Sequence, residues 1–101
     1  MSKDKRIVYY VAYDITEDET RGKVALTLKK YGMDRIQKSL FCGRLNSQSV
    51  KDLAEELTGT IKGKNSVYLI PTTKSLADKI IIIGIGFDKD YIYDKKQGEV
   101  I

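Results

Sequence analysis

The chain of 101 residues is long enough for one domain with a hydrophobic core, and 42% of its residues are apolar. It contains no histidine, which excludes acid–base catalysis by histidine, Ser–His and Cys–His nucleophile pairs, and ordinary zinc sites that use histidine. Its single cysteine, Cys42, cannot form a disulfide within the chain. Any bound metal would therefore be held by oxygen ligands, which suit Mg²⁺ or Mn²⁺.

The positive charge of the chain is concentrated in one segment. The formal net charge is +4, and between Arg21 and Arg44 seven basic residues accompany a single acid. Such a cluster predicts a polyanionic partner, although a solvated helix face with ordinary surface lysines would give the same pattern. No stretch approaches the ~20 uncharged apolar residues of a membrane-spanning helix, and the N-terminus does not resemble a signal peptide. We therefore expect a cytoplasmic protein without membrane contact.

The first predicted element is a strand over residues 7–14. An unbroken run of β-branched, aromatic and small apolar residues extends from Ile7 to Tyr13, which is typical of a central strand covered on both faces. Asp14 follows, where the strand leaves the core, because an unpaired carboxylate is costly to bury. Asp14 is then either a turn aspartate that helps the next helix to start, or an oxygen ligand for a hard cation.

A helix is predicted next, to about Tyr31. Thr16 and Glu19 have the spacing of a capping box, with Thr16 as the N-cap. Apolar residues then recur at helical spacing on one face. Gly32 follows the last turn and is a natural residue for the position after a helix end.

Two strands and a second helix follow. We expect a strand over about 35–41 and a short returning strand to about 45, with a bend or bulge at Gly43, where the parity of the apolar residues changes. Asn46 or Ser47 caps a second amphipathic helix, which ends near Gly59. A further strand over 66–70 is expected to stop at Pro71.

The last predicted strand covers residues 80–86 and is rich in isoleucine. A free edge of this composition would promote aggregation, so we expect it to be paired, and a dimer interface would provide the pairing. Residues 1–86 then form one domain, and residues 87–101 form a C-terminal tail. The element order predicts an α+β, ferredoxin-like βαββαβ fold with an antiparallel sheet, both helices on one face, and an extra C-terminal strand exchanged or paired across a homodimer.

Residues at three places along this predicted fold resemble a known family. They are Tyr13, Asp14 and Ile15 at the strand end, Arg21, Lys23, Tyr31 and Gly32 in the helix and its exit, and Arg35, Ile36, Gln37, Ser39, Phe41 and Gly43 in the second strand pair. Over about residues 7–86 the chain resembles CRISPR-associated protein family two, the small partner of the CRISPR integrase in spacer acquisition. Lys23 departs from the family pattern, which has an arginine there and hence a bidentate donor.

The resemblance implies a homodimer in which the last strands extend the partner's sheet, with Ile81 and Ile83 in that interface. It implies Asp14 as the catalytic residue and metal ligand, one from each subunit, so that Mg²⁺ or Mn²⁺ is shared between two subunits. The residues expected to contact nucleic acid are Tyr13, Arg21, Lys23, Arg35, Lys38 and Ser39. For Arg21 a salt bridge to Glu17 is the alternative, and Phe41 is expected in core or dimer packing.

Four functions fit these features. The chain is a metal-dependent nuclease on single-stranded RNA or duplex DNA, or a non-catalytic scaffold that holds duplex DNA for the CRISPR integrase. A third reading is a toxin-type endoribonuclease of similar fold, and a fourth is a ferredoxin-like regulatory module. We favour a CRISPR adaptation protein that binds the nucleic-acid backbone as a homodimer. Phosphate contacts predict a steep loss of affinity with salt, which the regulatory module would not show.

Overall fold

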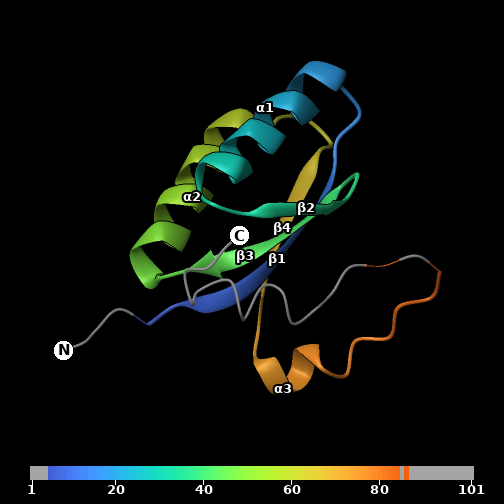
Figure 1. Cartoon of the computed structure of the whole chain (residues 1–101). Coiled ribbons are helices and arrows are strands. Elements are labelled where there is room, and N and C mark those ends of the chain that lie inside the picture. Colours follow the sequence, from blue (N-terminus) through green and yellow to red (C-terminus); the bar gives the residue numbers. More distant parts are fainter. Residues whose placement is uncertain (1–4, 85, 87–101) are drawn as a thin grey trace.

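The computed structural model describes residues 5–84 and residue 86, and it confirms the predicted α+β element order. Four strands and two long helices follow one another as predicted, and a short helix comes after the last strand (Figure 1). The elements are β1 (Ile7–Asp14), α1 (Asp18–Lys30), β2 (Asp34–Gln37), β3 (Leu40–Leu45), α2 (Ser47–Thr60), β4 (Ser66–Thr72) and α3 (Lys74–Ala77).

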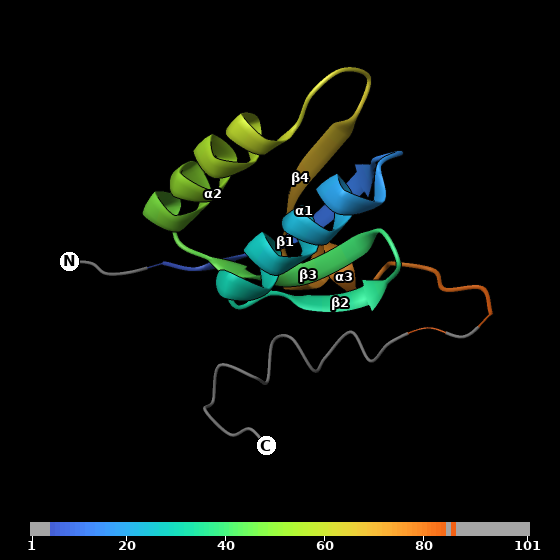
Figure 2. The ribbon, with the colours of Figure 1, turned by 90° about the horizontal axis from the view of Figure 1, so that it is seen from above.

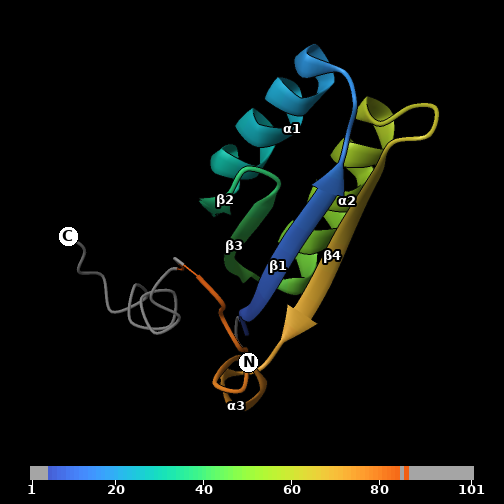
Figure 3. The same ribbon diagram turned by 90° about the vertical axis from the view of Figure 1, so that its right-hand side faces the viewer.

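The sheet is antiparallel, with the strand order β2-β3-β1-β4. β1 therefore lies in the interior of the sheet, as its unbroken apolar run predicts, while β2 and β4 form the edges. Both α1 and α2 lie on one face of the sheet, and α3 lies beyond the sheet's end, away from them (Figures 1 and 3). The β2–β3 hairpin forms the side of the sheet nearest α1 (Figure 2). This arrangement is the ferredoxin-like fold.

The main core fills the space between the helices and the sheet. Val11, Leu28, Phe41 and Leu53 are fully buried there, which confirms Phe41 as a core residue. Successive strand residues point to opposite faces, so β1 also has an outward-facing row on the side of the sheet away from the helices. On that side Val8 is buried with Cys42 in a second, smaller cluster.

The chain reverses between β2 and β3 at Lys38 and Ser39, so the bend predicted at Gly43 was wrong. Gly43 lies in the middle of β3 and is buried. A Cβ atom at this position would lie 2.9 Å from Met33 Cγ and 3.0 Å from Met33 Cα. The glycine thus allows the close approach of Met33. The change of parity arises because β3 is apolar on both faces, with Phe41 in the main core and Cys42 in the smaller cluster on the other side.

The capping box predicted at the start of the first helix was also wrong. α1 begins at Asp18 with Glu17 at the N-cap, and Glu17 makes no side-chain cap hydrogen bond. Thr16 lies one residue too early, and its backbone amide donates instead to Asn65 Oδ1 at 3.1 Å. The other helix boundaries were predicted well. Gly32 follows α1 with φ 82°, and the Asn46 side chain caps α2.

The third correction concerns the end of the sheet. Pro71 does not stop β4, which continues to Thr72, because an edge strand tolerates a residue without an amide proton on its free side. Residues 80–83 form no strand in the single chain, and Ile81 and Ile83 are 83% and 93% exposed. The tail over 87–101 lies outside the described residues. Within the described part, no helix is long and apolar enough to cross a membrane.

Candidate functional site

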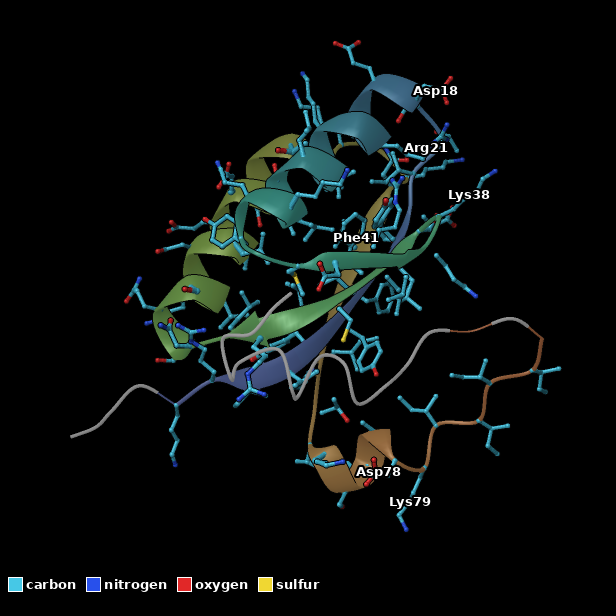
Figure 4. All side chains as sticks on the ribbon, viewed as in Figure 1. Asp18, Arg21, Lys38, Phe41, Asp78 and Lys79 are labelled. Atoms are coloured by element: carbon cyan, nitrogen blue, oxygen red, sulfur yellow. The ribbon has the colours of Figure 1, made fainter. Side chains whose placement is uncertain are left out.

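A cavity of about 520 Å³ lies where β1 ends, between the start of α1 and the β2–β3 turn. Asp18, Arg21 and Lys38 lie close together at this end of the molecule, opposite to the end that carries Asp78 and Lys79 (Figure 4). The cavity brings together six of the seven residues predicted to bind metal or nucleic acid. Its lining residues are Tyr13, Asp14, Ile15, Asp18, Arg21, Gly22, Arg35, Lys38 and Ser39.

Asp14 is the last residue of β1 and its side chain is exposed. It lies opposite Ser66 in the ladder between β1 and β4. It is not the N-cap of α1, so the cap role considered from the sequence does not apply. Among the described residues, no three His, Cys, Asp or Glu side chains come together as a metal site. One chain therefore offers a single uncommitted carboxylate at this cavity, because Asp18 is paired with Arg21.

Tyr13 ties the end of β1 to the β2–β3 turn. Its side chain is 5% exposed, and its hydroxyl donates to the Lys38 carbonyl oxygen at 2.9 Å. Its backbone amide donates to the Ser39 carbonyl oxygen at 3.0 Å. These bonds fix the main chain of both turn residues, so the turn projects the Lys38 and Ser39 side chains from a defined position.

The guanidinium group of Arg35 is held against the core by two contacts. The guanidinium carbon lies 5.4 Å from the centre of the Phe41 ring, within the range of a cation–π contact. Arg35 Nη2 also donates to the Tyr13 hydroxyl at 3.5 Å. Within residues 5–84 neither Arg35 nor Lys38 takes part in an ion pair. Two positive charges therefore face the cavity without a compensating carboxylate of their own.

Arg21 is fully engaged with its own chain. Its Nη1 atom donates to the carbonyl oxygens of Ile15 and Thr16 at 3.0 and 3.1 Å. Its Nη2 atom forms an ion pair with Asp18. The salt bridge considered from the sequence was to Glu17, and the structure places it one residue later. The guanidinium group thus holds the loop that joins β1 to α1.

Lys23 is the predicted residue that the structure does not bring to the cavity. It lines a separate hollow of about 280 Å³ together with residues of α1, such as Thr20, and residues at or just after the end of α2, such as Lys62. Its Nζ atom lies 3.9 Å from Glu19 Oε2. Residues 21 and 23 are two apart on a helix and therefore point in different directions, which accounts for the separation.

Asn65 contributes to the site region although sequence reasoning did not identify it. Its Nδ2 atom donates to Glu17 Oε1 at 2.7 Å, and its Oδ1 atom accepts from the Thr16 amide. The pKa of Glu17 is lowered, chiefly by the hydrogen bond from Asn65. No local sequence pattern predicts these contacts, because they join residues that are 48 and 49 positions apart. Only the pairing of β4 with β1 brings them together.

Comparison with known families and sequences gives a consistent assignment. A family model described as CRISPR associated protein Cas2 matches residues 7–80. A CRISPR-associated endoribonuclease Cas2 of Pyrobaculum aerophilum is 49% identical over 75 residues, which cover 73% of this chain and 82% of that protein. A CRISPR-associated endonuclease Cas1/endonuclease Cas2 fusion of Thermoproteus tenax is 50% identical over 56 residues, or 55% of this chain and 21% of the fusion.

Solved structures resemble the fold over most of its length. A hypothetical protein from Thermus thermophilus superimposes with a TM-score of 0.71 and 29% sequence identity, covering 81% of this chain and 95% of that one. A structure described as Cas2 gives a TM-score of 0.64 with 26% identity, covering 84% and 92% of the two chains. The similarity therefore includes both the helices and the four-stranded sheet.

Proposed function

This chain belongs to the CRISPR-associated protein Cas2 family, and from that membership we propose that it acts in CRISPR adaptation as a homodimer that binds the nucleic-acid backbone. We further propose that the dimer cleaves phosphodiester bonds of single-stranded RNA or duplex DNA with a divalent metal. The observation that carries the proposal is the convergence on one cavity of the Asp14 carboxylate with Arg35 and Lys38, none of which forms an ion pair with another described residue.

The cations have the chemistry required for a phosphodiester backbone. Arg35 presents a planar guanidinium group whose N–H donors match the oxygens of a phosphate. Because the group is already stacked on Phe41, its side chain loses less conformational entropy when a phosphate binds. Lys38 adds a point charge from the rigid turn, and the Ser39 hydroxyl can donate to a phosphate oxygen. Contacts of this kind position a nucleic acid without reading its sequence.

The open face of the sheet supports the homodimer. Tyr68 and Ile70 of β4 are 64% and 45% exposed, although both are large apolar residues. They lie opposite Ala12 and Tyr10 in the β1–β4 ladder, so they share a face with Asp14, which is two residues further along β1. A second copy that covers this face would lie beside Asp14. The exposed Ile81 and Ile83 would then supply the strand that pairs across the dimer.

A dimer would complete a metal site that the described residues of one chain do not form by themselves. Asp14 from each copy would hold Mg²⁺ or Mn²⁺, with water and substrate phosphate as the remaining ligands. When bound, the ion would polarise a phosphoryl oxygen and make a bound water more acidic. The chain's own contribution is to bind the phosphates through Arg35 and Lys38 and to hold the strand end in place through Arg21.

A scaffold is the second candidate, and one comparison favours it. The relative from Thermoproteus tenax joins a Cas1 part and a Cas2 part in one chain. We propose that this chain likewise works with a Cas1-type CRISPR integrase subunit. In that role the dimer would hold duplex DNA through backbone contacts, and Asp14 would not be required for binding.

One experiment separates these candidates. The purified dimer is incubated with labelled single-stranded RNA or duplex DNA, with Mg²⁺ or EDTA, beside Asp14→Ala. Asp52→Ala is the matched control, because Asp52 is an exposed carboxylate on α2 that pairs with Gln48, away from the cavity.

Cleavage that requires metal, is lost in Asp14→Ala and persists in Asp52→Ala supports the nuclease. Cleavage that survives in Asp14→Ala refutes a catalytic role for Asp14. Retention of duplex DNA without cleavage by any variant supports the scaffold. A monomer that retains neither nucleic acid contradicts the proposed function altogether.

A further inference from the structure

The two side-chain contacts of Asn65 join the loop after Asp14 to the loop before β4. Asn65 Oδ1 accepts from the Thr16 amide at 3.1 Å, and Asn65 Nδ2 donates to Glu17 Oε1 at 2.7 Å. Both polar ends of the side-chain amide therefore have a partner of the matching kind. A residue that could only accept, or only donate, would make one of the two bonds.

The loop at residues 15–17 has few other attachments. The Ile15 side chain is buried, and Arg21 binds the carbonyl oxygens of Ile15 and Thr16. These contacts hold the carbonyl groups, whereas the Thr16 amide donates its hydrogen bond to Asn65. Glu17 is the N-cap of α1 and makes no side-chain cap hydrogen bond. In this loop Asn65 therefore binds a backbone amide, whereas Arg21 binds the backbone carbonyl oxygens.

Asp14 lies directly before this loop. Its partner in the β1–β4 ladder is Ser66, the residue that follows Asn65, and this is the last pair of the ladder. Beyond that pair, the backbone after Asp14 is set by the contacts of Thr16 and its neighbours. A displacement of the loop would therefore rotate the peptide group between Asp14 and Ile15 and change the direction of the Asp14 side chain.

We infer that Asn65 is a positioning residue for the Asp14 carboxylate, an inference that rests on the proposed function of Asp14. Asn65 does not line the cavity, so it acts through the loop rather than on a bound nucleic acid. A carboxylate that shares a metal with a second copy has to be aimed within narrow limits, because displacements of about 1 Å can lower rates by about a hundredfold.

Asn65→Ala and the double variant Asn65→Asp with Glu17→Gln test the inference, with Asn46→Ala as the matched control. Asn46 makes an equivalent bond, from the Ser49 amide to its Oδ1 atom at 2.8 Å, at the start of α2 and outside the cavity. Asn46→Ala thus loses the same type of bond elsewhere. Asn65→Asp alone would place a second carboxylate against Glu17, so it is combined with Glu17→Gln. This pair keeps the acceptor for the Thr16 amide and the net charge, and the glutamine amide introduced at position 17 takes over as the donor.

We expect hydrogen exchange of the Thr16 amide to become about tenfold faster or more in Asn65→Ala, and to stay unchanged in Asn46→Ala. The carboxyl-carbon NMR signal of Asp14 should move only in Asn65→Ala. Metal-dependent cleavage by the full-length dimer should fall about tenfold or more in that variant. Asn65→Asp combined with Glu17→Gln should restore slow exchange and most of the cleavage.

The inference is overturned if Thr16 exchange and the Asp14 signal are the same in Asn65→Ala and the wild type. It is also overturned if cleavage falls equally in Asn46→Ala, since the effect would then be one of general stability. If the wild type cleaves neither RNA nor DNA, the nuclease proposal fails by itself. The exchange and NMR measurements then still decide whether Asn65 positions Asp14.

Discussion

The Tyr13 hydroxyl donates a hydrogen bond to the Lys38 carbonyl oxygen at 2.9 Å, across 25 residues of sequence. A buried residue of the central strand thereby holds the turn that carries a cavity lysine. The phenol ring itself packs near Phe41, with ring centres 6.2 Å apart. The same side chain therefore belongs both to the core and to the framework of the site.

Tyr13→Phe should keep this packing and remove the hydrogen bond. We expect the free energy of unfolding to fall by about 1 kcal/mol, which is typical of one buried hydrogen bond. Nucleic-acid retention should weaken as well, because the turn is no longer fixed. Urea denaturation and a filter-binding titration measure the two effects. Tyr31→Phe also removes a tyrosine hydrogen bond, the one to Glu56, but leaves the turn in place. It should therefore not weaken retention, and an equal loss of retention in both variants would contradict the role given to the Tyr13 hydroxyl.

Glu56 joins the two long helices by accepting from Lys30 Nζ at 2.7 Å and from the Tyr31 hydroxyl at 3.1 Å. The pKa of Glu56 is lowered below 4.5, first by the hydrogen bond from Lys30 and then by that from Tyr31. Because the folded-state pKa lies below the unfolded value, this contribution to stability is complete above the unfolded pKa. It is lost as pH falls through the lowered pKa.

Glu56→Gln should therefore reduce the acid sensitivity of the fold. We expect the wild type to lose more unfolding free energy between about pH 6 and about pH 3 than the variant does. Denaturant titrations at the two pH values provide the measurement. Glu55→Gln changes the neighbouring exposed residue, outside this network, and should keep the wild-type difference. A Glu56→Gln variant that is as acid-sensitive as the wild type would show that the helix–helix contact does not contribute.

Two glycines should respond to alanine in opposite directions. Gly43→Ala places a methyl group 2.9 Å from Met33 Cγ and close to the Met33 backbone, so we expect a loss of about 1–3 kcal/mol. Gly22→Ala lies within α1 and meets no atom within 4 Å, so better helix propensity should add about 0.5–1 kcal/mol. Urea denaturation of both variants tests the pair. A stable Gly43→Ala protein would refute the close packing of β3 against Met33.

Arg35 and Lys38 should each contribute one phosphate contact. For Arg35→Ala and Lys38→Ala, the slope of log affinity against log salt should become shallower by about 1 per binding site. Arg35→Lys should recover only part of the affinity, since lysine keeps the charge but lacks the planar fork. Lys51→Ala changes an exposed lysine of α2 and should leave the slope unchanged. A uniform decrease across all three alanine variants would indicate net charge rather than a site.

Much of the fold could be predicted because its main determinants are local. The unbroken run from Ile7 to Tyr13 identified the central strand, and Asn46 and Gly32 marked helix boundaries through their own chemistry. The turn at Lys38 was misplaced because β3 carries apolar side chains on both faces, which resembles a change of parity, and the nearby Gly43 offered a familiar explanation of that change. From the sequence alone, a glycine that is required by close packing cannot be distinguished from a glycine that is required by a turn.

The site could be predicted where its residues lie next to strand ends. Asp14 ends β1, and Lys38 and Ser39 form the turn between β2 and β3, so their convergence follows from the topology. Arg35 reaches the same cavity from within β2. The position of Lys23 depends on the direction in which its side chain leaves α1, and that direction leads to another hollow. The role of Asn65 depends on the register between β1 and β4, and the sequence does not display that register.

The position of β1 between β3 and β4 has a consequence during synthesis of the chain. Val8 pairs with Arg44 on one side and with Thr72 on the other. Until the ribosome has released the segment that contains Thr72, one edge of the most apolar strand stays bare and can join a neighbouring nascent chain. The cavity residues from Tyr13 to Ser39 emerge well before that closure. During synthesis the chain is therefore protected from aggregation only when β4 pairs with β1, which is later than the moment at which the cavity residues come together.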